Sequence, residues 1–231
     1  MVDRSAPAPA VATTRVATPA VAAAPSTTAI FTTVASTVVT TASPGVAPVT
    51  TDPEVVITDP RVFLLGDSVL EATSSDYYDT MEPRLERLGW EPTIDADRGR
   101  NTAQAERELR RNRDEVGETV VVLIGHNDPP SAGEYRSRLE DLLDEVEDVP
   151  RVLLLTIREF DEEMAPLNAV VRSMPRRHQN VELVEWEGTV ADAEGALVRD
   201  RLHLTERGAQ LLANVVAGAL GPAPGADGPL R

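Results

Sequence analysis

The fold class of this chain is decided by the stretch Arg61-Val62-Phe63-Leu64-Leu65-Gly66-Asp67-Ser68-Val69. Its apolar run stops abruptly at Gly-Asp-Ser, and a helical segment follows. An apolar run of this length bounded by a glycine is typical of a buried strand in a parallel sheet. Ligands of open α/β sheets lie outside the carboxyl ends of the strands, so Ser68 is a candidate nucleophile. The same three residue types are common in turns, and the tripeptide alone favours an ordinary turn.

Four more short segments have the character of buried strands. They cover residues 92–96, 119–124, 151–156 and 181–184, and helices are expected between them. The first helix is predicted from Ser74 to near Gly89, with Tyr77 on its apolar face, and a polar loop is expected after Trp186. Strands that alternate with helices and carry apolar runs predict a three-layer α/β fold with a five-stranded parallel sheet.

The composition divides the chain into three parts. Residues 1–54 are rich in Ala, Pro and Thr and lack large apolar side chains, which predicts a disordered or extended tether. Residues 55–220 form the folded domain, and residues 221–231 form a loose Pro/Gly-rich tail. The tether is a poor transmembrane helix and a poor signal peptide, so an export signal is not visible in this sequence.

Charge and residue usage narrow the function classes. The chain has 231 residues and a formal net charge of −16, which argues against a nucleic-acid partner. It has no cysteine, which rules out disulfides, a thiolate nucleophile and cysteine-bound metal. Its three histidines, His126, His178 and His203, are dispersed and do not have the spacing of a metal site.

Unusual residues follow three of the predicted strands. Gly66-Asp67-Ser68 follows the first, Gly99 the second and Gly125-His126-Asn127-Asp128 the third. A parallel sheet brings these strand ends to one edge. The segment from Asp200 to His203 precedes the last helix and can fold over the same edge.

Together these segments offer the groups that nucleophilic ester hydrolysis requires. The reaction needs a hydroxyl, a base, a group that orients the base, and donors for the oxyanion. Ser68 supplies the hydroxyl, His203 is the candidate base, and Asp200 can orient its ring. The oxyanion donors would be the backbone N–H groups of Ser68 and Gly99 and the side-chain amide of Asn127.

In this order, Gly66-Asp67-Ser68-Val69, Gly99, Gly125-x-Asn127-Asp128 and Asp200-x-x-His203 resemble the four blocks of the SGNH (GDSL-type) hydrolases. The resemblance spans residues 61 to 220 and implies a flavodoxin-like α/β/α fold. It also implies the roles given above for these residues, in an enzyme that requires no metal and no cofactor.

Three further segments resemble one subgroup of this family. Asn168-Ala169-Val170-Val171-Arg172, Val184-Glu185-Trp186 and His203-Leu204-Thr205 are similar to SGNH domains fused to actinobacterial integral-membrane acyltransferases. Those proteins acylate cell-surface polysaccharide or peptidoglycan. The resemblance implies an extracytoplasmic location, an acylated glycan or small ester as substrate, and a membrane acyltransferase domain as a candidate partner.

Other functions fit parts of the pattern. A catalytically silent carbohydrate-binding domain would share the fold, although every side chain needed for catalysis is present. A flavodoxin-like nucleotide binder would need a Gly-rich phosphate loop, and this sequence lacks one.

Several neighbours of the candidate groups have roles that the sequence leaves open or assigns to structure. His126 is expected either to face solvent or to contact substrate. Asp67 is expected to fix the Ser68 turn and Asp128 to stabilise its loop. Arg98 and Arg100 flank Gly99 and are either substrate contacts or solvated charges.

Overall fold

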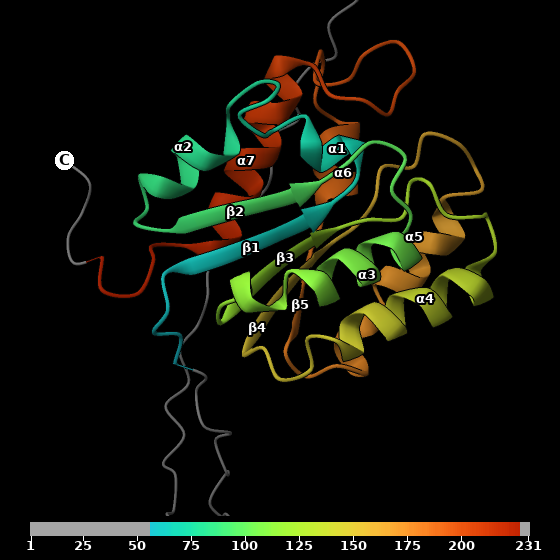
Figure 1. Cartoon of the computed structure of the whole chain (residues 1–231). Coiled ribbons are helices and arrows are strands. Elements are labelled where there is room, and N and C mark those ends of the chain that lie inside the picture. Colours follow the sequence, from blue (N-terminus) through green and yellow to red (C-terminus); the bar gives the residue numbers. More distant parts are fainter. Residues whose placement is uncertain (1–55, 227–231) are drawn as a thin grey trace, which may run out of the picture. The chain divides into compact units, whose positions relative to one another are not determined.

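The computed structural model describes residues 56–226. The predicted tether lies outside the described residues. Five strands form one sheet in the order β2-β1-β3-β4-β5, and every neighbouring pair is parallel (Figure 1). Their bounds are Arg61–Gly66 for β1, Glu91–Ala96 for β2, Thr119–Leu123 for β3, Arg151–Leu155 for β4 and Val181–Val184 for β5.

Helices cover both faces of the sheet. Figure 1 shows α2 and α7 on one face and α3, α4 and α5 on the other, which confirms the predicted three-layer α/β/α fold. The helices are α1 Ser68–Glu71, α2 Met81–Glu86, α3 Thr102–Arg111, α4 Ala132–Asp144, α5 Ala165–Val171, α6 Trp186–Ala191 and α7 Glu206–Leu220. Short 3₁₀ turns lie at Arg113–Glu115 and Met174–Arg176. Within the described part, no helix combines the length and apolar character needed to cross a membrane.

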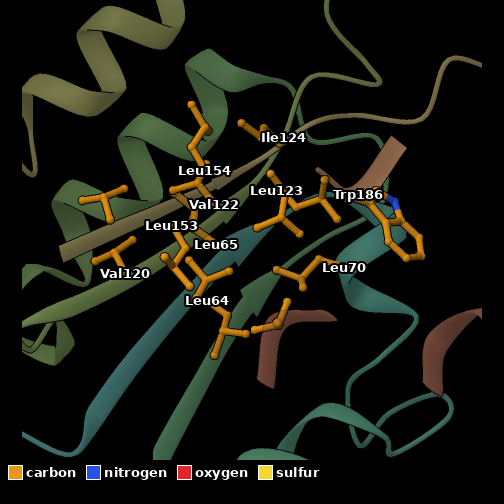
Figure 2. Packing of buried hydrophobic residues seen from close by; sticks show 14 of the residues in the cluster. Leu64, Leu65, Leu70, Val120, Val122, Leu123, Ile124, Leu153, Leu154 and Trp186 are labelled. Carbon is orange, nitrogen blue, oxygen red and sulfur yellow. The ribbon is translucent and has the colours of Figure 1, made fainter. Parts of the chain in front are cut away.

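The central strands form the core. Residues such as Leu64, Leu65, Val120 and Val122 are completely buried because helices cover both faces of the strands (Figure 2). This burial explains why the strands have continuous rather than alternating apolar runs. Each such leucine contributes about 1.5–3 kcal/mol to stability by leaving water.

The strand register places the site. Gly66 at the end of β1 pairs with Ala96 of β2 and with Leu123 of β3, so the three strands end at the same level of the sheet. The strand order reverses between β1 and β3, which is where ligands bind in open α/β sheets. Gly66 is needed there because an added Cβ would lie 2.6 Å from the Cβ of Leu70 and 2.8 Å from the carbonyl oxygen of Leu123. The glycine lets α1 begin directly against the sheet.

The helix predicted from Ser74 begins only at Met81, so that prediction was wrong in its start. The Ser74 hydroxyl donates to the Glu71 carbonyl at 2.8 Å and does not cap a helix. Ser74 lies in a bend, residues 75–78 form turns, and Asp79 has a φ of 48°, a left-handed conformation that does not continue a helix. Tyr77 therefore lies in a loop.

Two further segments are more ordered than expected. The polar loop predicted after Trp186 contains the short helix α6. The first residues of the predicted loose tail pack against the domain: the Trp90 indole N–H donates to the Gly221 carbonyl at 2.8 Å, and Ala223 is buried. The packed part of the chain thus extends beyond Leu220, and residues 227–231 lie outside the described part.

Candidate active site

Ser68 is the first residue of α1, at the carboxyl end of β1. Asp67 is the N-cap of this helix, and its Oδ1 accepts the backbone N–H of Val69 at 3.0 Å. The cap fixes the turn between strand and helix, which is the structural role expected for Asp67. The turn leaves Ser68 half-buried, with its hydroxyl toward the site.

His203 lies on the loop before α7 and reaches the turn at Ser68. Its Nε2 lies 3.2 Å from Oγ of Ser68, although 135 residues separate the two in sequence. Its Nδ1 lies 2.8 Å from Oδ2 of Asp200. Since a carboxylate accepts the Nδ1 proton, Nε2 has a free electron pair toward the serine hydroxyl. The structure thus brings Ser68, His203 and Asp200 together in the order predicted.

Asp200 is held as an anion. Its partial burial raises its pKa, but hydrogen bonds from the backbone N–H of Leu202, the His203 ring and the backbone N–H of His203 lower that pKa overall, to about 2. These bonds also fold the loop into a tight turn. Arg201 at its centre has a φ of 63°, which is uncommon for a residue other than glycine.

Gly99 and Asn127 lie on the loops that follow β2 and β3. Gly99 has a φ of 71°, a conformation that glycine adopts without strain. Nδ2 of Asn127 donates to the backbone carbonyl of Arg100 at 3.0 Å, which joins the two loops. An amide nitrogen has a second hydrogen, so one N–H of Asn127 remains for a substrate. Arg100 itself is buried and pairs with Asp95 at 2.7 Å, which removes it from the candidate substrate contacts.

No family model matches this sequence, and no curated protein matches it. Solved structures do. The peptidoglycan O-acetyltransferase A (OatA) C-terminal catalytic domain of Streptococcus pneumoniae aligns with a TM-score of 0.57 and 20% identity, over 71% of this chain and 93% of that one. A family 3 carbohydrate esterase of Clostridium thermocellum aligns with 0.55 and 19%, over 68% and 93%. A member of the lipolytic protein G-D-S-L family from Veillonella parvula aligns with 0.53 and 14%, over 68% and 96%.

This chain has the SGNH (GDSL-type) hydrolase fold. The fold resemblance drawn from four short sequence blocks is therefore confirmed. At these identities the structural likeness establishes the fold, and the chemistry has to be argued from the residues of the site.

In this SGNH fold, Asp128 ties the loop after β3 to the start of α3. Its Oδ2 accepts both the backbone N–H of Thr102, at 2.9 Å, and the Thr102 hydroxyl, at 2.7 Å. Its Oδ1 accepts from Arg138 at 3.0 Å. The buried carboxylate therefore fixes the loop that carries Asn127, which is the stabilising role expected for it.

A cavity of about 460 Å³ opens beside Ser68. In addition to Ser68 and His203, it is lined by Glu71, Ala72, Tyr77, Tyr78, Arg98 and Leu204. The two tyrosines are 43% and 40% exposed. The Arg98 guanidinium lies 5.0 Å from the centre of the Tyr77 ring and 3.6 Å from the Glu71 carboxylate. The sequence missed the tyrosines because their spacing before Met81 fits the apolar face of a helix.

His126 occupies neither of the positions that the sequence allowed. Its side chain is completely buried, so it does not face solvent, and it does not line the cavity. Its Nδ1 lies 2.8 Å from Oδ2 of Asp67. Both expectations for His126 are thus replaced by a buried contact with Asp67, the residue before Ser68. Among residues 56–226, no group of three or more acidic or histidine side chains is arranged to hold a metal ion.

Proposed function

We propose that this chain is a serine ester hydrolase or O-acyltransferase in which Ser68, His203 and Asp200 form a catalytic triad. The observation that carries the proposal is the pair of contacts of the His203 ring, 3.2 Å to Oγ of Ser68 and 2.8 Å to Oδ2 of Asp200. A base placed between a hydroxyl and a carboxylate is the arrangement that activates a serine nucleophile.

In the acylation step, Oγ of Ser68 attacks the carbonyl carbon of the ester while its proton passes to Nε2 of His203. The carbonyl electrons move to oxygen, which gives a tetrahedral oxyanion. When the ester C–O bond breaks, the leaving alcohol takes the proton from Nε2. The product is an acyl-enzyme on Ser68, and Asp200 stabilises the transient imidazolium.

The oxyanion needs donors that are in place before the reaction. The backbone N–H groups of Ser68 and Gly99 and the second Nδ2 hydrogen of Asn127 are the proposed donors. The bond from Asn127 to the Arg100 carbonyl and the bonds of Asp128 to Thr102 support this, because they hold the two loops rigidly. Removing one such donor costs about 10²–10³ in kcat in other serine hydrolases.

The acyl-enzyme is resolved by water or by a sugar hydroxyl. His203 removes the acceptor's proton, the new C–O bond forms, and Ser68 leaves with that proton. Hydrolysis and transfer use the same residues, so the acceptor decides between them. Product analysis with a glycan acceptor present distinguishes the two: a new sugar ester indicates transfer, and free carboxylic acid alone indicates hydrolysis.

The proposed substrate is a short acyl ester, such as an acetyl ester, of a cell-surface carbohydrate. The neighbours named as a peptidoglycan O-acetyltransferase and a carbohydrate esterase support this class. So do the exposed rings of Tyr77 and Tyr78 at the cavity, because aromatic faces pack against the apolar faces of sugars. An extracytoplasmic location and a membrane acyltransferase domain as partner belong to the same proposal.

Replacing the nucleophile tests the proposal. Ser68→Ala should lower kcat for p-nitrophenyl acetate by about 10⁴–10⁶-fold, the scale known for triads. It should also abolish labelling by a fluorophosphonate probe. Ser173→Ala is the matched control, because Ser173 is a partly buried serine that donates to the Val170 carbonyl. A Ser68→Ala variant with the parent rate refutes the triad. A parent protein that binds glycans but resists labelling would point to the silent binding domain.

A further inference from the structure

His126 is a buried titratable group that the proposed reaction does not use. The backbone N–H of Arg158 donates to its Nε2 at 2.9 Å, and its Nδ1 lies 2.8 Å from the buried carboxylate of Asp67. A backbone N–H can only donate, so Nε2 has no proton. The proton is then on Nδ1, where the Asp67 carboxylate accepts it. These two contacts fix the ring as a neutral imidazole in one tautomer.

The Asp67 end of this contact leads directly to the nucleophile. One carboxylate oxygen caps α1 through Val69, and the other accepts the His126 ring proton. Burying a carboxylate is costly unless hydrogen bonds satisfy both oxygens. The His126 ring therefore keeps Asp67 in the orientation that sets the turn at Ser68.

The Arg158 end leads to the loop that carries the base. Nε of Arg158 donates to the backbone carbonyl of Arg201 at 3.1 Å, and its Nη1 donates to Oε1 of Glu187 in α6 at 2.6 Å. The Arg201 side chain donates to the backbone carbonyl of Phe160, two residues after Arg158, at 2.7 Å. The bonds from Arg158 and to Phe160 together hold Arg201, whose left-handed φ shapes the turn between Asp200 and His203.

We propose that His126 and Arg158 are positioning residues that set the contact between Ser68 and His203. The inference rests on the proposed function. A continuous series of hydrogen bonds runs from the Ser68 turn through Asp67, His126 and Arg158 to the turn at Arg201. Asp67, His126 and Arg158 follow β1, β3 and β4, respectively, and the carboxyl ends of these strands lie at one side of the sheet.

The need for such a series follows from the exposure of the base. The side chains of His203 and Asp200 are 48% and 49% exposed, so packing alone does not fix them. Nucleophilic attack depends steeply on geometry, and a displacement of about 1 Å can cost about 10²-fold in rate. A rigid link from the sheet to this loop keeps the imidazole within reach of the hydroxyl.

Arg158→Met tests the link without touching the triad. The substitution keeps the backbone bond to His126 and removes the side-chain bonds to Arg201 and Glu187. We expect kcat for p-nitrophenyl acetate to fall by about 10–100-fold, with KM within about threefold of the parent. The rate of fluorophosphonate labelling of Ser68 should fall by the same factor.

Arg151→Met is the matched control. Arg151 also pairs with a carboxylate, that of Glu182, and donates to the backbone carbonyls of Ala219 and Leu220. It lies at the amino end of β4, at the opposite ends of the strands from the site. It should lower the unfolding midpoint and leave kcat within about twofold, at a temperature where both variants are folded. A merely structural role of Arg158 would make the two variants behave alike.

Two histidine variants separate the bonds of the ring. His126→Asn can still donate to Asp67 but loses the acceptor for Arg158, and His126→Gln keeps the acceptor and loses the donor. Each should lower kcat with KM little changed. The downfield proton resonance of the His203 Nδ1–H should weaken or shift in these variants and in Arg158→Met, and should stay unchanged in Arg151→Met.

The outcomes distinguish this inference from the proposed function. If Ser68→Ala is inactive while the folded His126 and Arg158 variants keep the parent kcat and the parent His203 resonance, the positioning role is refuted and the triad stands. If Ser68→Ala keeps its activity, the proposed function fails first. If a histidine variant does not fold, Arg158→Met and the His203 resonance decide.

Discussion

Asp200→Asn separates the proposed chemistry from folding stability. The Asp200 carboxylate accepts the His203 Nδ1–H at 2.8 Å and the backbone N–H groups of Leu202 and His203 at 2.9 and 3.0 Å. An asparagine keeps an oxygen for the backbone donors but presents an NH₂ group to Nδ1. A donor there favours the tautomer with the proton on Nε2, which can no longer take the proton of Ser68.

The expected loss in kcat/KM is about 10⁴-fold, the size found when the same change is made in a serine protease triad. This corresponds to about 5.4 kcal/mol of transition-state stabilisation, at about 1.36 kcal/mol for each tenfold step. The free energy of unfolding at pH 7 should fall by only about 1 kcal/mol or less, because solvent screens a pair whose side chains are 48% and 49% exposed.

The stability difference should also depend on pH. Although desolvation raises the pKa of Asp200, its hydrogen bonds lower it to about 2 in the folded protein, compared with 3.8 for an ordinary aspartate. A lowered pKa means that the ionised carboxylate stabilises the folded state above pH 3.8. This contribution is lost as the pH falls through 2. The difference between parent and Asp200→Asn should therefore shrink between these two pH values.

The measurements are kcat/KM for p-nitrophenyl acetate at neutral pH and urea unfolding at several pH values. Asp192→Asn is the control, because it makes the same change in charge at an exposed residue at the end of α6. The control should keep the parent activity. If Asp200→Asn retains kcat/KM within tenfold of the parent while Ser68→Ala is inactive, Asp200 does not orient the base and the reasoning is wrong.

Three further substitutions probe the supports of the site. Gly208→Ala should destabilise the fold by about 1–3 kcal/mol or more in urea unfolding, because its Cβ would overlap the Ala196 carbonyl oxygen where α7 meets the loop carrying His203. Asp128→Ala should lower the unfolding free energy by about 2–4 kcal/mol, since it leaves the buried Thr102 donors unpaired; an unchanged midpoint would contradict this. Tyr77→Ala should change stability by less than about 0.5 kcal/mol and raise KM for acetylated glycans but not for p-nitrophenyl acetate; equal KM changes for both would exclude a sugar contact.

The sequence predicted the sheet because the signal lay within each segment. The runs around Leu64, Val121 and Leu153 are apolar throughout, which is required of strands covered on both faces. The same local signal failed at residues 74–80. There the hydroxyl of Ser74 donates to the Glu71 carbonyl, and Asp79 adopts a left-handed conformation that the residue types of this segment do not predict.

What the sequence alone determined is which candidate residues are present and their order: Ser68 just after a strand, loops carrying Gly99 and Asn127, and an Asp200-x-x-His203 turn before the last helix. These follow from local spacing and from the rule that parallel strands end at one edge.

The tertiary structure decided what those residues face. Nε2 of His203 lies 3.2 Å from Oγ of Ser68, Tyr77 lines the cavity, and His126 is buried against Asp67. The physical reason is that each of these contacts joins segments from different parts of the chain, so burial and hydrogen-bond partners exist only once the strands are paired.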